Sequence, residues 1–265
     1  MIGRFSHRPA HSLARRLVDG LRSRFVGGIG KSQSVYFVNI VGQRYKRVVF
    51  GDSRLAEVVE ANLEAVGWGA GLPRLVLRHE NEIWLEYVTG RALDVRQAGD
   101  LQALAEFFAT LYRHDSRQLP VAQTHLHTRL QTDLAFLGDA GVLPRQRVGQ
   151  LLEAADGLKP EFIWSGLDYV DPVTKNFVVA PRGLVAIDVE SLQAGQPLGT
   201  GVAKSRVHWL GDGADEFTAR IIAAGAPDFR EQFRYVELCF LAAWTKRKLF
   251  AGKRRHVDPE RFTCF

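Results

Sequence analysis

The sequence predicts an α+β protein with two lobes, a small β-rich N-terminal lobe and a larger, mostly helical C-terminal lobe. Three observations lead to this fold class. Before Gly90 the apolar residues follow a strand, strand, helix, strand, strand order. From Asp100 onward they recur at the helical period of 3.6 residues. The chain has 265 residues, of which 46% are hydrophobic and 24% charged, which is typical of a globular protein with one large domain or two lobes.

Two predicted hairpins account for the strands of the first lobe. Residues 35–40 and 45–50 are β-rich runs joined by a turn that contains Gly42. Residues 75–77 and 83–88 form a second pair, joined by a polar turn. We therefore expect an antiparallel sheet in this lobe.

The segment between the two hairpins predicts a helix. Asp52 or Ser53 can cap its N-terminus, because either short polar side chain can accept a hydrogen bond from a free backbone N–H group of the first turn. Gly67 is expected to end it. Its apolar positions keep helical spacing: Leu55, Val58, Val59, Leu63 and Val66. The N-terminal lobe is expected to span residues 27–88.

The second lobe, residues 89–265, is expected to be mostly helical. Apolar residues at helical spacing mark three segments: Leu101 to Leu111, Leu130 to Leu137, and Val148 to Leu152. Two further helical stretches close the chain near Arg255. One β-like island, formed by residues 177–180 and 184–189, interrupts the helices.

The net charge of +6 is concentrated at the start of the chain. The first 31 residues contain seven lysines and arginines and one acid, so the rest of the chain is balanced. A nucleic-acid-binding domain is therefore not indicated. Within the N-terminal arm, residues 1–26, apolar residues recur every fourth position among arginines and predict a short basic amphipathic helix: Leu13, Leu17, Leu21 and Phe25. The sequence leaves three roles open for it: contact with an anionic membrane surface, a transit peptide, or packing on its own domain.

Other classes of protein are excluded by what the sequence contains. No stretch has the roughly 20 apolar residues that a membrane-spanning helix needs, and the N-terminus has no apolar run typical of a secretory signal. Two cysteines form neither a disulfide framework nor a zinc site by themselves. We expect a cytoplasmic protein, with the basic arm as the part suited to peripheral contact with the inner membrane surface.

Three polar residues with distinctive spacing are the main candidates for chemistry. Asp171 and Asn176 are five residues apart, and Asp188 follows twelve residues later, at the end of the predicted hairpin. A hairpin brings its two ends together, so Asp171, Asn176 and Asp188 are expected to converge on one spot. Carboxylate and amide oxygens are ligands that Mg²⁺ prefers, and a carboxylate can receive the proton of a hydroxyl group in phosphoryl transfer.

In this pattern the sequence resembles the aminoglycoside phosphotransferase and choline kinase families, which are relatives of the protein kinases. The resemblance covers most of residues 27–255 and implies a two-lobe protein kinase-like fold. It implies that Asp171 is the catalytic aspartate and that Asn176 and Asp188 hold metal. The residues after Asn176, the helical lobe and the basic arm are also similar to bacterial kinases of lipopolysaccharide core sugars.

The resemblance extends to the predicted nucleotide-binding lobe. The glycine-rich segment before the first hairpin resembles the loop that covers the phosphates, with Gly28, Gly30 and Ser32 as candidate contacts. Either Lys46 or Arg47 is expected to hold the α and β phosphates, and the strand pattern does not choose between them because neighbouring side chains point to opposite faces.

Two further elements of the nucleotide site follow from the resemblance. A glutamate on the predicted helix is expected to pair with the phosphate-binding cation, with Glu57 preferred and Glu60 as the alternative. Residues 85–90 resemble the hinge between the lobes, where backbone groups around Glu86 and Val88 would bind adenine.

The sequence departs from the family pattern at two places. Tyr169 stands where relatives usually have histidine, two residues before the catalytic aspartate. The structural aspartate that many relatives have at a helix start after the metal site has no match in residues 197–203. We therefore expect the catalytic loop to be anchored in a different way.

Together these residues predict a kinase that uses ATP and Mg²⁺ to phosphorylate a hydroxyl group of a small molecule or saccharide, such as a lipopolysaccharide core sugar. An aminoglycoside is a polycation, and residues 100–160 contain no dense cluster of acids to receive one. The alternative is a catalytically inactive module of the same fold that binds a nucleotide or a partner. The sequence does not indicate an oligomeric state.

Overall fold

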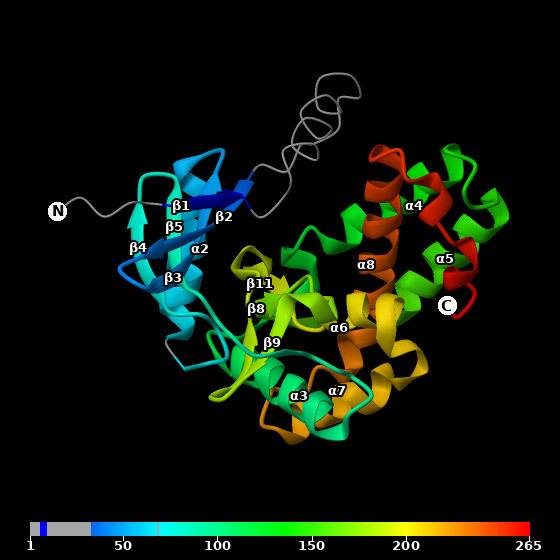
Figure 1. Ribbon diagram of the computed structural model, residues 1–265. Helices are drawn as coiled ribbons and strands as arrows, with labels where there is room; N and C mark the ends of the chain where they lie inside the picture. Colours follow the sequence, from blue (N-terminus) through cyan, green and yellow to red (C-terminus); the bar gives the residue numbers. More distant parts are fainter. Residues whose placement is uncertain (1–5, 10–32, 68) are drawn as a thin grey trace. The chain divides into compact units, whose positions relative to one another are not determined.

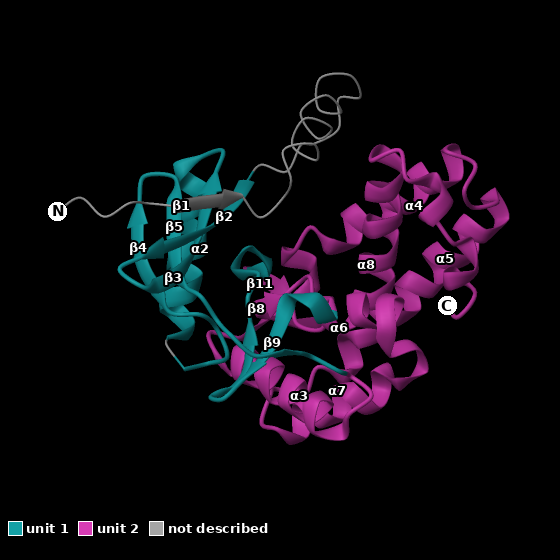
Figure 2. Cartoon of the chain, viewed as in Figure 1, with its two compact units in different colours: residues 1–94, 174–192 teal, residues 95–173, 193–265 magenta. Residues whose placement is uncertain are grey.

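The computed structural model describes residues 6–9, 33–67 and 69–265, and of residues 6–9 it describes only the backbone. The chain forms two compact units, coloured teal and magenta in Figure 2. Unit 1 comprises residues up to 94 together with residues 174–192, and unit 2 comprises residues 95–173 and 193–265. The amphipathic pattern of the N-terminal arm lies outside the described residues, so its helix and its membrane contact stay predictions.

The main sheet of unit 1 has five antiparallel strands in the order β1-β2-β3-β5-β4 (Figure 1). The strands are β1 (Ser6–Pro9), β2 (Gln33–Ile40), β3 (Gln43–Phe50), β4 (Leu75–His79) and β5 (Glu82–Glu86). Val41 and Gly42 connect β2 to β3 with φ angles of 48° and 80°. Positive φ at both turn residues matches the twist of the adjacent strands, which is why glycine suits this position. Both predicted hairpins are confirmed.

The predicted helix is α2 (Ser53–Val66), which packs on this sheet. The Asp52 side chain caps it by accepting a hydrogen bond of 2.9 Å from the N–H of Arg54, and Gly67 ends it with φ of 79°. Its inner face contributes five buried residues: Ala56, Val59, Asn62, Leu63 and Val66. Two of the predicted apolar positions, Leu55 and Val58, are instead 43% and 56% exposed. The buried face of α2 is therefore narrower than the apolar face that its sequence predicts.

A second, three-stranded sheet explains why residues 174–192 belong to unit 1. Its strands have the order β10-β9-β6, with β6 at Arg91–Ala92, β9 at Phe177–Ala180 and β10 at Gly183–Ala186. Gly90, just before β6, lies so close to β9 that an added Cβ would be 2.2 Å from the carbonyl oxygen of Val179. The predicted lobe limits, 27–88 and 89–265, therefore differ from the compact units, because backbone pairing joins the β9–β10 hairpin to the N-terminal part of the chain.

Unit 2 contains the predicted helices and a small sheet that the sequence did not indicate. The helices are α3 (Ala98–Arg113), α4 (Leu126–Asp139), α5 (Arg145–Leu158), α6 (Thr200–Ser205), α7 (Ala214–Ala223) and α8 (Arg230–Phe250). The sheet has the order β11-β8-β7, with β7 at Arg117–Pro120, β8 at Phe162–Tyr169 and β11 at Leu192–Pro197. Most of β8 is buried on both faces, so it lacks the alternating pattern that reveals a half-buried strand.

Aromatic side chains hold β8 and helix α3 together in the core of unit 2. Phe107 meets Tyr169 edge to face with ring centroids 5.6 Å apart, and Phe108 meets Phe217 of α7 in the same way at 6.0 Å. Tyr112 contacts Phe229 at 5.3 Å. Edge-to-face pairs favour a defined geometry, so the strand that leads to Asp171 is fixed by its packing.

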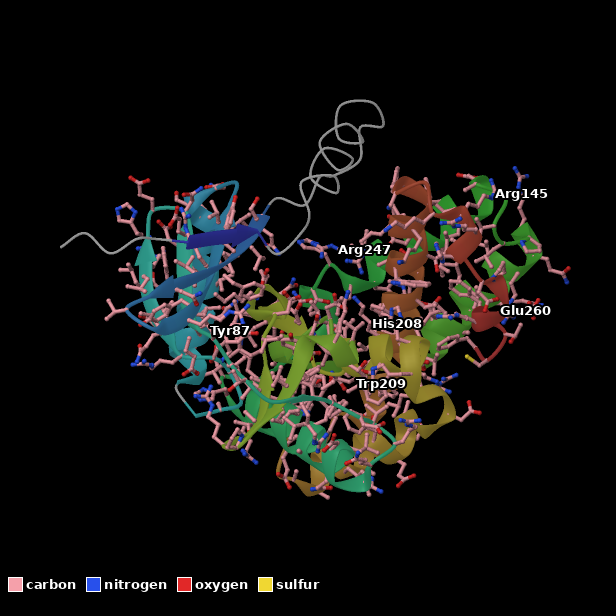
Figure 3. All side chains as sticks on the ribbon, in the orientation of Figure 1. Tyr87, Arg145, His208, Trp209, Arg247 and Glu260 are labelled. Carbon is pink, nitrogen blue, oxygen red and sulfur yellow. The ribbon has the colours of Figure 1, made fainter. Side chains whose placement is uncertain are left out.

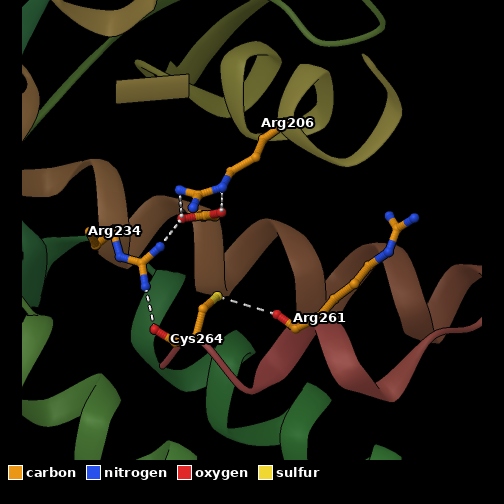
Figure 4. A network of polar contacts seen from close by, with 5 residues as sticks. Arg206, Arg234, Arg261 and Cys264 are labelled. Atoms are coloured by element: carbon orange, nitrogen blue, oxygen red, sulfur yellow. Dashed lines mark hydrogen bonds and ion pairs between the residues drawn. The ribbon is translucent and has the colours of Figure 1, made fainter. Parts of the chain in front are cut away.

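Arg234 of α8 contacts both the carboxylate of Glu237 and the C-terminal segment (Figure 4). Arg206 and Arg234 both pair with Glu237, at 3.1 Å and 2.7 Å. Arg234 also donates to the carbonyl oxygen of Cys264 at 2.5 Å. Burial raises the pKa of Glu237, and the two guanidinium groups oppose that rise.

Among the described helices, none combines the length and apolar character needed to cross a bilayer.

Candidate active site

Strand β3 directs Lys46 toward the helix-covered face of the unit 1 sheet. Lys46 lies opposite Leu85 of β5, and it shares its face with the fully buried Val48. Its Nζ atom donates a hydrogen bond of 2.6 Å to the carbonyl oxygen of Ile187 and lies 3.9 Å from Oε2 of Glu190. The ammonium group is thereby held at the end of the β9–β10 hairpin.

Arg47 points to the opposite face of the same strand. Its Nε atom donates a hydrogen bond of 2.8 Å to Glu82, and the pair raises the pKa of Arg47. The guanidinium group also lies over the rings of Tyr36 and Trp84, 5.5 Å from each centroid. Of these two residues, only Lys46 lies beside the hairpin that carries Asp188, and its role as the phosphate ligand stays a prediction.

The hairpin brings Asn176 and Asp188 together across twelve residues of sequence. Phe177 pairs with Ala186 in its last register position, so the residues just outside the strands face each other. The N–H of Ile187 donates to the carbonyl oxygen of Asn176 at 2.7 Å. The side-chain amide of Asn176 then lies 3.4 Å from Oδ2 of Asp188, which also accepts a hydrogen bond of 2.9 Å from Ser191.

Glu190 adds a second carboxylate to this cluster, and the sequence analysis did not single it out. Burial raises the pKa of Glu190 to about 7; Lys46 opposes the rise and the neighbouring Asp188 adds to it. Gln33 donates a hydrogen bond to Glu190. Two carboxylates that repel each other form a site that a cation would stabilise, and the ammonium group beside them favours an anion such as phosphate.

The donor set of this cluster fits a magnesium ion. Mg²⁺ takes oxygen ligands and is usually bound by one or two carboxylates together with phosphate oxygens. Asp188 and the amide oxygen of Asn176 are the residues that would hold it. In the part of the chain that the structure describes, no three His, Cys, Asp or Glu side chains gather into a metal site of their own. Phosphate oxygens and water would complete the coordination.

Neither predicted glutamate of helix α2 reaches Lys46. Glu60 pairs with Arg78 of β4, and Glu57, whose side chain is 56% exposed, lies 3.9 Å from the same arginine. The expectation that one of them pairs with the phosphate-binding cation differs from the structure. The inward polar residue of α2 is Asn62, which donates a hydrogen bond of 3.0 Å to the carbonyl oxygen of Leu192. Lys46 has Glu190 as its carboxylate partner instead.

The predicted hinge residues lie at the end of β5. The carboxylate of Glu86 accepts hydrogen bonds from Arg182 and from the N–H of Arg74, the latter at 2.8 Å. Burial raises the pKa of Glu86, but the hydrogen bonds outweigh this effect, so that the pKa lies below its usual value. Tyr87, labelled in Figure 3, stacks under Arg44 at 4.0 Å. Binding of adenine by the backbone near Val88 stays a prediction, and Gly28, Gly30 and Ser32 lie outside the described residues.

Asp171 follows β8 in unit 2 and has a cation beside it. The Nζ atom of Lys204 on α6 lies 2.5 Å from Oδ1 of Asp171, whose side chain is 37% exposed. Trp209, labelled in Figure 3, donates a hydrogen bond of 3.0 Å from its indole nitrogen to the carbonyl oxygen of Pro172, which fixes the loop. Burial and Lys204 lower the pKa of His208. The sequence did not single out Lys204, because it is distant from Asp171 in the chain.

A buried aspartate on β8 anchors this loop, in place of the helix-start aspartate that the sequence lacks. Asp168 is completely buried and accepts hydrogen bonds of 3.0 Å from the N–H of Gly201 and from the hydroxyl of Tyr112. The same hydroxyl accepts a hydrogen bond of 3.0 Å from the N–H of Gly199. An added Cβ at Gly201 would be 2.3 Å from the carbonyl oxygen of Tyr169, so glycine is required for this approach. The loop is anchored from the strand side, and Tyr169 is buried at the position where histidine was expected.

The ionisation of Asp168 is expected to make stability depend on pH. Burial raises its pKa to about 7, although four hydrogen bonds oppose the rise. An unfolded aspartate has a pKa of about 3.9, so the unfolded chain releases this proton first, and the free energy of unfolding falls as pH rises from about 4 to about 7. Between pH 5 and pH 7, the free energy of unfolding of the wild type should fall by about 2 kcal/mol more than that of the Asp168→Asn variant. Urea unfolding at both pH values measures this difference. An equal fall in the free energy of unfolding for the variant and the wild type would contradict the prediction.

Comparison with known proteins identifies the fold. No protein-family model matches the sequence, and no curated protein matches it. Solved structures do match. The macrolide 2'-phosphotransferase MphH from Brachybacterium faecium has a TM-score of 0.63 at 17% identity, covering 94% of this chain and 97% of that one. The choline kinase LicA from Streptococcus pneumoniae has a TM-score of 0.61 at 13% identity, covering 96% of this chain and 100% of that one.

A third match is a thermostable mutant of the aminoglycoside phosphotransferase APH(4)-Ia, solved in a ternary complex with ADP and hygromycin B. Its TM-score is 0.58 at 14% identity, and the match covers 93% of this chain and 97% of that one. These matches define the class of the fold. The chain has the two-lobe protein kinase-like fold shared by small-molecule phosphotransferases and choline kinases, as the sequence predicted.

Proposed function

We propose that this protein is an ATP-dependent phosphotransferase that moves the γ-phosphoryl group to a hydroxyl group of a small molecule or saccharide. The observation that carries the proposal is the cluster of Lys46, Asn176, Asp188 and Glu190, in which an ammonium group lies beside two carboxylates and an amide. That combination suits a metal-bound polyphosphate better than a neutral ligand, since it offers both a cation for phosphate and oxygen ligands for Mg²⁺.

Each residue has a defined part in the proposed reaction. Lys46 binds the α and β phosphates, and backbone groups near Glu86 and Val88 bind adenine. Mg²⁺, when bound by Asn176 and Asp188, neutralises phosphate charge. The glycine-rich segment would cover the phosphates.

Asp171 acts on the acceptor. Its carboxylate orients the acceptor hydroxyl and takes its proton as the oxygen bonds to the γ-phosphorus. The bond between that phosphorus and the β–γ bridging oxygen breaks, and ADP leaves. The ammonium group of Lys204, 2.5 Å from Oδ1 of Asp171, holds this carboxylate in position.

The nature of the acceptor is less constrained than the reaction. The neighbours with known structures are named for macrolides, aminoglycosides and choline, which are chemically diverse. A saccharide, such as a lipopolysaccharide core sugar, remains our preferred acceptor from the sequence.

Adjacent residues on β3 provide the test of the nucleotide site. We expect Lys46→Ala to weaken binding of ATP with Mg²⁺ by 10- to 100-fold, because it removes charge-assisted hydrogen bonds of about 1.5–3 kcal/mol. Arg47→Ala removes the same charge from the opposite face and should leave the affinity unchanged. Isothermal titration with and without Mg²⁺ measures both. Equal effects of the two substitutions would contradict the site.

Turnover separates the enzyme from the inactive alternative. Purified protein is incubated with γ-labelled ATP and a cell extract that is then divided into protein, lipid and small-molecule fractions. Label in the small-molecule or lipid fraction is expected. ATP binding that depends on Mg²⁺ but transfers no label would overturn the enzymatic proposal and leave a nucleotide-binding module.

A further inference from the structure

A cavity of about 500 Å³ lies in unit 2, lined by helices α4 and α8 and by the start of α6. Its size is within the range of roughly 300–1,000 Å³ that is usual for small-molecule sites. Much of the wall is apolar, and the residues that provide it include Leu126, Leu130, Val236, Phe240 and Phe250. Such a wall favours a ligand with an aliphatic or aromatic body.

The charged residues of the cavity are mostly cations. Lys246 is neutralised by Asp133, which accepts a hydrogen bond of 2.6 Å from its Nζ atom and is the one acid in the lining. Arg129 and Arg247 also line the cavity, and their guanidinium groups have no ion-pair partner among the residues that the structure describes. Figure 3 labels Arg247 on α8. Two unpaired arginines beside an apolar wall favour an anionic group on the ligand, and they repel a polycation.

Helix α6 connects this cavity to Asp171. Thr200 lines the cavity, and Lys204, four residues later, contacts Asp171. Residues four apart lie on the same face of a helix, about 6 Å apart along its axis. Burial is the main cause that lowers the pKa of His208, and Lys204 and Lys248, the residue after Arg247 on α8, lower it further. The excess of positive charge therefore extends from the cavity toward Asp171.

We propose that this cavity binds an amphipathic anion, a molecule whose aliphatic body contacts the apolar wall and whose phosphate or carboxylate group is held by Arg129 and Arg247. As the acceptor of the phosphoryl group this molecule would also carry a hydroxyl group, and that role rests on the proposed function. Its binding does not, because none of the lining residues belongs to the nucleotide cluster.

The test compares head groups on one chain length. Dodecyl phosphate, dodecyl maltoside and dodecyltrimethylammonium are titrated into the full-length protein without nucleotide, below their micelle concentrations, and inorganic phosphate is the control without a chain. We expect dodecyl phosphate to bind at least 10-fold more tightly than any of the other three. Binding of the cationic compound with equal affinity would overturn the proposal, as would binding that appears only with micelles or vesicles.

Substitutions at exposed positions test the residues without disturbing the core. Arg129→Ala and Arg247→Ala should each weaken binding of dodecyl phosphate by about 10-fold and leave dodecyl maltoside unchanged. Arg145→Ala is the matched control, because Arg145 is an exposed arginine on α5 that is not part of the lining (Figure 3). Phe250, which is 69% exposed, tests the apolar wall, and Phe250→Ala should weaken both compounds.

The two proposals fail in different experiments. If the arginine substitutions leave dodecyl phosphate binding unchanged while labelled ATP is still turned over, the cavity proposal is wrong and the proposed function stands. If the head-group selectivity and the arginine effects are found without any transfer of label, the cavity proposal is supported and the enzymatic proposal fails. Thermal unfolding of each variant confirms that it is folded.

Discussion

The Asp188→Asn substitution is expected to lower γ-phosphoryl transfer by about 10³-fold. It keeps the shape of the side chain but removes the charge that faces the proposed metal. A metal ion supplies several kcal/mol of charge stabilisation in such reactions, and about 4 kcal/mol corresponds to a factor of 10³. Initial rates with labelled ATP and the acceptor fraction measure the effect, and titration with Mg²⁺ should show loss of metal-dependent ATP binding.

The control for this substitution is Glu64→Gln. Glu64 lies on the exposed side of helix α2, so the substitution removes one carboxylate from the same unit without touching the hairpin. Its rate should stay within about twofold of the wild type. The role given to Asp188 is wrong if Asp188→Asn keeps a wild-type rate. It is also wrong if thermal unfolding shows that the variant loses activity only because it is unfolded.

Asp171→Asn is expected to lower kcat by 10²- to 10⁴-fold while the affinity for ATP stays unchanged. General base catalysis contributes about this much, and asparagine cannot accept the proton of the hydroxyl group. The ammonium group of Lys204, 2.5 Å from the carboxylate, would also lose its partner. Single-turnover rates measure kcat, and calorimetry measures ATP binding separately.

Asp139→Asn is the matched control, since Asp139 is an exposed aspartate at the end of α4 in the same unit. A fall in ATP affinity equal to the fall in kcat would place Asp171 in nucleotide binding instead. A rate unchanged by Asp171→Asn would exclude it as the base.

The local parts of the fold were predictable because their signals are short in sequence. Gly42 marks the first hairpin, and Asp52 and Gly67 mark the ends of helix α2. The convergence of Asn176 with Asp188 was predictable for the same reason, since a hairpin determines which residues meet at its open end. These features need no knowledge of distant contacts.

What the sequence could not give depends on orientation and on distant partners. Which of Lys46 and Arg47 lies beside the β9–β10 hairpin depends on which face of β3 meets helix α2, and a shift of one residue reverses it. Glu57 and Glu60 have suitable spacing, but the rotation of α2 directs them toward Arg78. Strand β8 was not predicted, because it is buried on both faces and its sequence therefore lacks the alternation of apolar and polar residues.

Glu190 and Asp168 were missed for a related reason. Glu190 is only two residues from Asp188, but its role follows from contact with Lys46, which is 144 residues away in the sequence. Asp168 is surrounded by apolar residues in a buried strand, where an acid needs partners such as Tyr112 and Gly201. An acid within a predicted buried strand is a signal that points to such partners.

The placement of Asp168 bears on how distant relatives of this chain are recognised. A sequence pattern that requires an acid at the start of the helix after the proposed metal site would miss any chain in which an aspartate of the preceding strand anchors this loop. A pattern that combines an aspartate three residues before the proposed catalytic one with two glycines spaced like Gly199 and Gly201 would retrieve them. The two arrangements are alternative ways of holding the same loop in place.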